Sequence, residues 1–410
     1  MEANAVFSTR NRSIDVFRAL TMFLMVTVND FWTVLDVPKW LLHTETSFDG
    51  MGLSDIVYPM FLLVMGMSIP YAMERRFSKG DTPESVLLHV IKRSFTLILM
   101  GVLLVNSEGT IAPLLGYSKG VYWLLMLLGI FLIWNVYPAP EKRSPVVKKL
   151  VPVLKAVGIA ALLFLLFTYR SPKGGAMVGS WWGILGQLGW SYLFCAFVYF
   201  FARKCPRPVA PISIVYGILV LANMYLVRTR TGDSLGFLPR PNVIGDIFDA
   251  IHVGRASSQI MTLGGVLLSL VGASFASRSE GRKLSIGFAA AALFLVLGFV
   301  ARTEWIISKN IGTLPWCFIV TAISIALYTL LRFLEGRGHL GWARPILPAG
   351  TSTLTVYMIP YFYYSLWVVF SMYPLPWLTG WIGVCKCVLF SFLCIGTAWC
   401  LEKLGIKLKI

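Results

Sequence analysis

The sequence predicts an all-α membrane protein, a polytopic bundle of about twelve transmembrane helices. Of the 410 residues, 57% are hydrophobic and only 13% are charged, whereas a soluble domain usually carries about 25% charged residues. Apolar runs of about twenty residues, the length that crosses roughly 30 Å of hydrocarbon, recur along the whole chain. No polar stretch is long enough for a separate soluble domain. Residues 1–410 are therefore expected to form one integral membrane domain.

The helices follow from apolar length, interrupted by Pro, Gly and charged residues. The first run follows the polar segment MEANAVFSTRNRS and lacks a small-residue cleavage site behind it. It is therefore expected to be a retained helix and not a removed signal peptide. The expected ranges, in order, are 14–34, 53–73, 88–106, 119–137, 149–169, 183–202, 209–227, 258–277, 284–301, 313–332, 347–371 and 377–401.

The distribution of Lys and Arg predicts the orientation. With the chain start placed in the cytoplasm, the inner segments hold more than twice as many Lys and Arg as the outer ones. Short cytoplasmic loops carry this excess in membrane proteins, so both termini are expected inside. The net charge of +17 is then a topology signal and an attraction to anionic lipid head groups. No basic stripe lies on a soluble module, so nucleic-acid binding is not expected.

Ionisable groups within membrane depth are costly and tend to mark function. Asp15 and Arg18 lie at the inner end of the first helix, and their spacing of three places them on one helix face. They are expected to pair there. The seven cysteines lie mostly inside apolar runs, and Cys385 and Cys387 are two residues apart. That spacing does not suit a metal site, so no metal is expected.

Three polar residues flank the turn between the first two helices. Asn29 ends the first helix, Asp55 begins the second, and His43 lies between them. Asn29 and His43 are expected to converge at the outer mouth of a cavity, where an imidazole can accept a proton near neutral pH. An ordinary loop position for His43 and a helix N-cap role for Asp55 are the alternatives.

The same region carries motifs of a known family. The tract RSIDVFRALTMFLMVTVND, then His43, then DGMGLSDIVYPMFLLVMGMSI resembles the heparan-α-glucosaminide N-acetyltransferase family and its bacterial relatives. The resemblance is dense in residues 12–70 and scattered beyond them. The later tracts are IKRSFTLILMGVLL, GILGQLGWSYL, ISKNIGT and AGTSTLTVY. Residues 119–169 look like an insertion relative to the family core.

The resemblance implies a transmembrane acetyltransferase in a bacterial inner (cytoplasmic) membrane. Such an enzyme moves acetyl from cytoplasmic acetyl-CoA to an amino sugar, such as glucosamine, on the outer side. His43 would be the general base, Asn29 would donate to the oxyanion, and Asp55 would orient the imidazole. A heparan chain end is not implied as the acceptor, and a homodimer is left open.

The basic inner rim would hold the phosphates of acetyl-CoA. The rim consists of Arg12, Arg75, Arg76, Lys92, Arg93, Arg203 and Lys204. Arg93 and also Arg18, with Asp15 beside it, are the expected cofactor-binding residues. The same rim also follows from the positive-inside rule alone.

Three alternatives remain open at this stage. A sugar O-acetyltransferase would share the architecture. A secondary transporter also commonly has twelve spans, but the two halves of this sequence are not alike, and no acid lies in the middle of a span. A structural or lipid-organising membrane protein leaves Asn29, His43 and Asp55 without a role.

Overall fold

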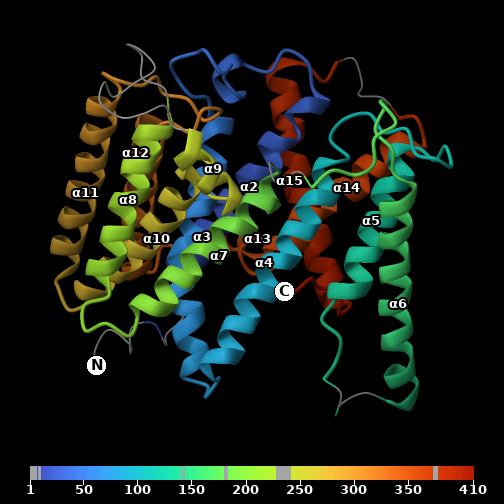
Figure 1. Ribbon diagram of the computed structural model, residues 1–410, viewed down its shortest axis with the longest axis horizontal. Helices are drawn as coiled ribbons and strands as arrows, with labels where there is room; N and C mark the ends of the chain where they lie inside the picture. Colours follow the sequence, from blue (N-terminus) through green and yellow to red (C-terminus); the bar gives the residue numbers. More distant parts are fainter. Residues whose placement is uncertain are drawn as a thin grey trace.

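The computed structural model describes residues 7, 11–139, 141, 144–179, 183–227, 242–372 and 377–410. Over these residues the chain is all-helical, with only isolated backbone bridges in place of strands (Figure 1). The α-helices are α2 (Arg12–Asn29), α3 (Leu53–Phe77), α4 (Pro83–Val105), α5 (Lys119–Trp134), α6 (Pro145–Thr168), α7 (Ile184–Ala202), α8 (Val209–Leu226), α9 (Asn242–Ala250), α10 (Ser257–Ser274), α11 (Glu280–Ala301), α12 (Leu314–Gly336), α13 (Leu347–Thr351), α14 (Thr353–Val369) and α15 (Gly380–Lys403). Short 3-10 turns are η1 (Phe31–Thr33), η2 (Lys39–Leu41) and η4 (Gly341–Ala343).

The all-α prediction is confirmed, and each of the twelve expected ranges overlaps a long helix. Within the described part of the chain, nine helices are long and apolar enough to cross a membrane. They are α3, α4, α6, α7, α8, α10, α11, α12 and α15. These helices define an integral membrane protein. The shorter or more polar α2, α5 and α14 fall outside this set.

One expected helix is broken. The range 347–371 forms α13 and α14, separated at Ser352, whose backbone angles (φ −124°, ψ 39°) are not helical. The break lets α13 lie directly against α2: a Cβ added to Gly350 would lie 2.3 Å from the carbonyl oxygen of Asp15. Small residues permit such close approach of helices in membranes, and Pro348 is the second residue of the short α13.

Helix α3 lies at the centre of the bundle, and most of its residues are buried. Its closest neighbour is α10. A Cβ at Gly66 would lie 1.8 Å from the carbonyl oxygen of Thr262, and one at Gly265 would lie 2.0 Å from that of Leu63. Side chains larger than hydrogen cannot occupy these positions, so glycines fix the two helices at backbone contact.

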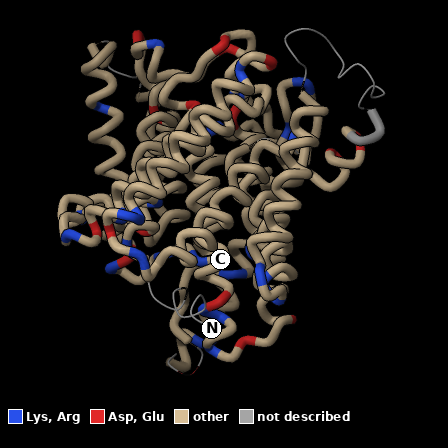
Figure 2. The backbone as a smooth tube through the Cα atoms, turned by 90° about the vertical axis from the view of Figure 1, so that its left-hand side faces the viewer, with Lys and Arg blue, Asp and Glu red and all other residues tan. Residues whose placement is uncertain are grey.

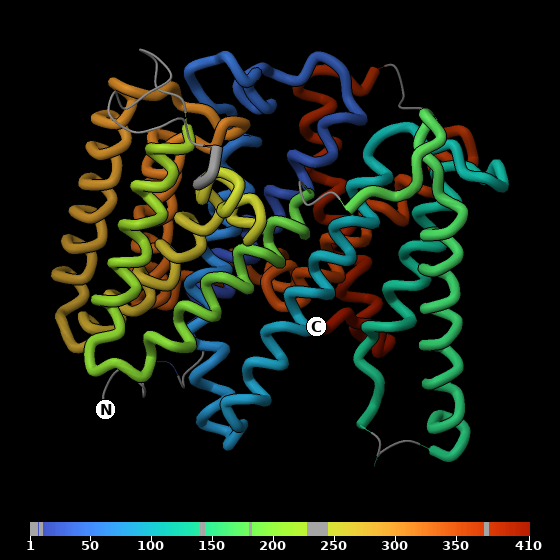
Figure 3. The backbone as a smooth tube through the Cα atoms, viewed as in Figure 1, coloured from blue at the N-terminus to red at the C-terminus, as the bar shows by residue number. Residues whose placement is uncertain are grey.

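The bundle has two polar ends. The segment between α2 and α3 lies at the upper end, whereas the start of α2, the α3–α4 turn and Ile410 lie at the lower end (Figure 1). Figure 2 shows Lys and Arg gathered mainly at the lower end. Of the expected outer loop 228–257, residues 228–241 lie outside the described residues, and the rest includes the short helix α9. The helices α5 and α6 pack on each other beside α14 and form one flank of the bundle, with α11 on the opposite flank (Figure 3).

Candidate functional site

At the upper end of the bundle, His43 and Asp55 form a close pair. His43 Nδ1 lies 2.7 Å from Asp55 Oδ1. The Asp55 side chain is only 1% exposed, whereas that of His43 is 51% exposed. A buried carboxylate therefore holds one edge of the ring, and the rest of the ring remains accessible.

The second oxygen of Asp55 fixes the carboxylate in place. Oδ2 accepts hydrogen bonds from the Thr44 amide (3.0 Å), the Thr44 hydroxyl (3.0 Å) and the Gly52 amide (3.1 Å). Asp55 is the third residue of α3, and the N-cap position that the alternative gave to Asp55 belongs to Gly52, whose amide donates to the Asp55 carboxylate. Capping and contact with His43 therefore occur together, each through a different oxygen.

A distant segment between α11 and α12 completes this cluster. Lys309 Nζ lies 3.1 Å from His43 Nδ1 and 3.9 Å from Asp55 Oδ1. Asn310 Nδ2 donates to the carbonyl of Thr44 at 3.0 Å. Burial lowers the pKa of the Lys309 ammonium, and the Asp55 carboxylate opposes that shift. His43, Thr44, Asp55, Lys309 and Asn310 are here named the upper cluster.

The contacts of His43 decide which ring nitrogen carries the proton. An ionised carboxylate only accepts hydrogen bonds, and a lysine ammonium only donates them. The shorter contact, 2.7 Å to Asp55, assigns the proton to Nδ1. In the neutral ring Nε2 then carries the lone pair, which is the arrangement of an imidazole that acts as a base.

The structure does not join Asn29 to this cluster by a hydrogen bond. Asn29 is the last residue of α2 and is half-buried. The neighbouring Asp30 is fully buried, and its Oδ2 lies 2.7 Å from Lys386 Nζ. Asp30 also accepts a hydrogen bond from the Tyr364 hydroxyl at 3.0 Å. Asp30 thus ties the end of α2 to α14 and α15, whereas Asn29 has no comparable side-chain contact with the described residues.

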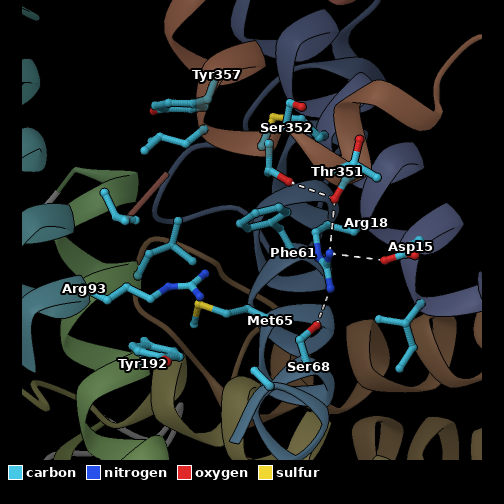
Figure 4. Close-up of a pocket in the computed structure, with 18 of the residues that line it drawn as sticks. Asp15, Arg18, Phe61, Met65, Ser68, Arg93, Tyr192, Thr351, Ser352 and Tyr357 are labelled. Atoms are coloured by element: carbon cyan, nitrogen blue, oxygen red, sulfur yellow. Dashed lines mark hydrogen bonds and ion pairs between the residues drawn. The ribbon is translucent and has the colours of Figure 1, made fainter. Parts of the chain in front are cut away.

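At the lower end, a cavity of about 660 Å³ opens between α2, α3, α4, α7 and α14 (Figure 4). All three expected cofactor-binding residues, Asp15, Arg18 and Arg93, line it. The lining reaches from Asn11 to Met25, about 20 Å along α2 at 1.5 Å per residue. The deeper wall is apolar, with Met22, Met25, Phe61, Met65 and Leu97. A charged mouth and an apolar interior suit a ligand that has an anionic head and a slender, less polar arm.

The two arginines of this cavity have different surroundings. Arg18 donates to the Gly350 carbonyl (3.1 Å) and the Ser68 hydroxyl (2.6 Å), and lies 3.5 Å from Asp15. Arg18 and Asp15 therefore pair as their spacing predicts, and they link α2 to α3 and α13. Arg93 stacks over the Tyr192 ring at 4.8 Å, and its buried Nε has no hydrogen-bond partner among the described residues.

Three other arginines of the basic rim also differ in whether they pair with a carboxylate. Arg203 forms a two-pronged pair with Glu74, at 2.7 and 2.8 Å, and Arg76 pairs with Asp81 at 2.8 Å. The charges of Arg203 and Arg76 are therefore already paired with carboxylates of the protein. Arg75 is exposed and lines the cavity. Arg75 and Arg93 are therefore the rim residues best placed to meet an incoming anion.

Thr44, Lys309 and Asn310 belong to the upper cluster but were not predicted from the sequence. Lys309 lies in the ISKNIGT tract, which was the available signal, but 266 positions separate Lys309 from His43. Thr44 follows His43 directly and carries no motif of its own.

The fold and these features define a class: an integral membrane protein with a histidine–carboxylate pair at one end and a cationic cavity at the other. Residues 10–207 match a family model described as a domain of unknown function (DUF5009). The chain is 30% identical over 140 residues, 32% of its length, to heparan-alpha-glucosaminide N-acetyltransferase of Mus musculus. It is 31% identical over 121 residues, 30% of its length, to the Homo sapiens protein of that name.

These matches cover 21% and 18% of the two relatives, so the matched part of this chain spans about a fifth of their length. The family-level relationship to heparan-alpha-glucosaminide N-acetyltransferase, which the motifs in residues 12–70 indicate, is confirmed. The named activity belongs to those relatives.

Proposed function

We propose that this protein is a transmembrane acetyltransferase that moves acetyl from cytoplasmic acetyl-CoA to an amino sugar on the outer side of the membrane. The proposal includes twelve spans, both termini in the cytoplasm and a bacterial inner membrane. The observation that carries it is the placement of the upper cluster and the cationic cavity at opposite ends of one bundle. The family relationship supports the type of reaction.

The cavity fits the donor by its chemistry. Acetyl-CoA has a polyanionic nucleotide and a thioester at the end of a slender arm. Arg75 and Arg93 would meet the phosphates, because both line the cavity and arginine pairs well with phosphate oxygens. The arm would extend along α2 and α3 past Met25 and Phe61. Met25 is one helical turn below Asn29, and Phe61 is about 9 Å below Asp55 along its helix.

His43 would act as general base on the acceptor. The sugar nitrogen forms a bond to the acetyl carbonyl carbon, and the carbon–sulfur bond of the thioester then breaks. The proton lost by the amine goes to Nε2 of His43, and the coenzyme A sulfur leaves as a thiolate that takes this proton from the imidazolium, which restores the neutral base. Asp55, holding Nδ1–H, stabilises the imidazolium that forms. Asn29 would donate its amide N–H to the oxyanion, a contribution of about 3–4 kcal/mol where such donors have been removed.

The test is radiolabelled acetyl transfer to glucosamine in proteoliposomes, with bound acetyl-CoA measured in parallel. His43→Ala is expected to abolish transfer and to leave acetyl-CoA binding nearly intact, whereas Asn29→Ala should lower turnover more than binding. Near-normal turnover by His43→Ala would contradict the assignment. Acetylated protein that accumulates without acceptor would favour attack by His43 itself.

Two controls separate the alternatives. An acceptor whose amine is replaced by a hydroxyl distinguishes N-acetylation from O-acetylation. Uptake of labelled glucosamine into proteoliposomes that lack acetyl-CoA would indicate a transporter.

A further inference from the structure

The last five described residues of the chain return to the cavity. After α15 ends, residues 406–410, here named the strap, run back across the lower end of the bundle. Leu408, Lys409 and Ile410 all line the same cavity as Arg75 and Arg93. Leu408 is only 4% exposed, so the strap is seated in the bundle and does not hang free from it.

Hydrogen bonds attach the strap to the end of α5. Leu408 forms an isolated antiparallel bridge with Asn135. The bonds are Val136 N to Lys407 O (2.9 Å), Lys407 N to Asn135 Oδ1 (2.8 Å), Lys409 N to Trp134 O (3.1 Å) and Leu408 N to Thr355 Oγ1 (3.0 Å). Among the described residues, Asn135 is the one that contributes a side-chain acceptor from the end of α5. The segment from 119 to 169, which looks like an insertion in the sequence, thus supplies three of these four bonds, and Thr355 in α14 supplies the fourth. Ile406 N and Lys407 Nζ bond back to Leu401 and Glu402 of α15.

The strap adds a cation where the cavity wall carries little negative charge. Asp15 has the one side-chain carboxylate among the described lining residues, and it pairs with Arg18. Lys409 is exposed, and its ammonium has no partner among the described residues. Arg75 from α3, Arg93 from α4 and Lys409 from the strap thus line one cavity from three separate segments. Three cations around one cavity suit a ligand with several phosphates better than one with a single carboxylate.

We infer that the strap forms one wall of the phosphate-binding mouth, with Lys409 as a cationic contact for the donor nucleotide and Asn135 as the positioning residue that holds the strap. The inference rests on the proposed function, because it names further residues that bind the same donor. It also gives α5 and α6 a role, since the end of α5 determines where Lys409 lies.

The experiment measures binding to the full chain in detergent micelles by competition against radiolabelled acetyl-CoA. The competitors are coenzyme A and pantetheine, which lacks the nucleotide phosphates. Lys409→Gln should raise the dissociation constant of coenzyme A about three- to fivefold, as expected for an exposed ion pair, and leave that of pantetheine unchanged. The matched control is Lys403→Gln, an exposed lysine at the end of α15 that does not line the cavity.

Asn135→Ala tests the positioning role. It leaves every cavity-lining side chain in place, so it should weaken coenzyme A binding in the same direction and spare pantetheine. A loss of affinity for both ligands would indicate general unfolding of the cavity and overturn the positioning role. If Lys409→Gln leaves coenzyme A affinity unchanged while Arg93→Ala clearly lowers it, the proposed role of the strap is overturned and the proposed function is retained. Wild-type protein that binds neither acetyl-CoA nor coenzyme A would overturn the proposed function itself.

Discussion

Replacing Asp55 by Asn tests the histidine–carboxylate pair more sharply than removing His43. Asp55 accepts from His43 through Oδ1 at 2.7 Å and from three donors of Thr44 and Gly52 through Oδ2. An asparagine has one acceptor oxygen and one donor NH₂ group. The three donors retain the oxygen on their side, so the new NH₂ group faces His43 and donates to Nδ1. The ring proton then moves to Nε2, and the lone pair needed for base catalysis is lost.

The expected size of this effect follows from the same contacts. A wrong imidazole tautomer lowers turnover by roughly 10³- to 10⁴-fold, which corresponds to about 4–5.5 kcal/mol of transition-state free energy. Lys309 also loses the carboxylate 3.9 Å from its Nζ. The loss of hydrogen bonds to a charged group is expected to reduce the free energy of unfolding by about 1.5–3 kcal/mol.

The assay is acetyl transfer in proteoliposomes, with thermal unfolding and acetyl-CoA binding measured on the same preparations. Binding should be nearly unchanged, because the cationic cavity lies at the other end of the bundle. The matched control is Glu45→Gln, which neutralises an exposed carboxylate in the same segment. Asp55→Asn turnover within tenfold of the wild type would refute the tautomer argument.

Three further predictions test other parts of the molecule. Arg93→Ala should raise the acetyl-CoA dissociation constant at least about tenfold at low salt, and by less as ionic strength rises; an affinity that salt does not change would argue against a phosphate contact. In a variant without the seven native cysteines, Glu45→Cys should react with an impermeant maleimide from outside and Lys79→Cys only from inside, and the reverse pattern would exclude the proposed orientation. Gly350→Ala should destabilise the protein by about 1–3 kcal/mol, seen as a lower unfolding temperature in detergent, because its Cβ would lie 2.3 Å from the carbonyl oxygen of Asp15; an unchanged temperature would show that α13 moves freely from α2.

Local pattern was sufficient for some of the site. His43 and Asp55 are only twelve positions apart, and the resemblance implied their contact, whereas the convergence of Asn29 and His43 that the polar pattern predicted stays a prediction. Asp15 and Arg18 pair because three residues is nearly one helical turn. The helix ranges are equally local, since each depends on a run of apolar residues that is longer than its interruptions.

Contacts across the bundle were not predictable in this way. Arg18 lines the expected ligand cavity, and it also donates to Gly350, 332 positions away. That contact depends on the break at Ser352, which apolar length alone does not predict. Lys309 joins His43, and Lys409 joins Arg93 at one cavity, only because separate helices pack side by side. The positive-inside pattern identified a basic rim, but not which of its members would be neutralised by Glu74 or Asp81.

Helix α3 contains residues of both functional ends of the bundle, Asp55 of the upper cluster and Arg75 of the cavity. Asp55 and Arg75 are separated by about 30 Å along it at 1.5 Å per residue, which matches the hydrocarbon thickness of a bilayer. Pro59 and Pro70 lie inside this helix without ending it, and contacts with α10 at Gly66 hold it in place. In the proposed reaction, the span between the phosphate anchor and the base is therefore set by peptide geometry. Because the donor itself would span the bundle, a thioester made inside the cell could acetylate an acceptor outside, and no activated compound would have to be exported.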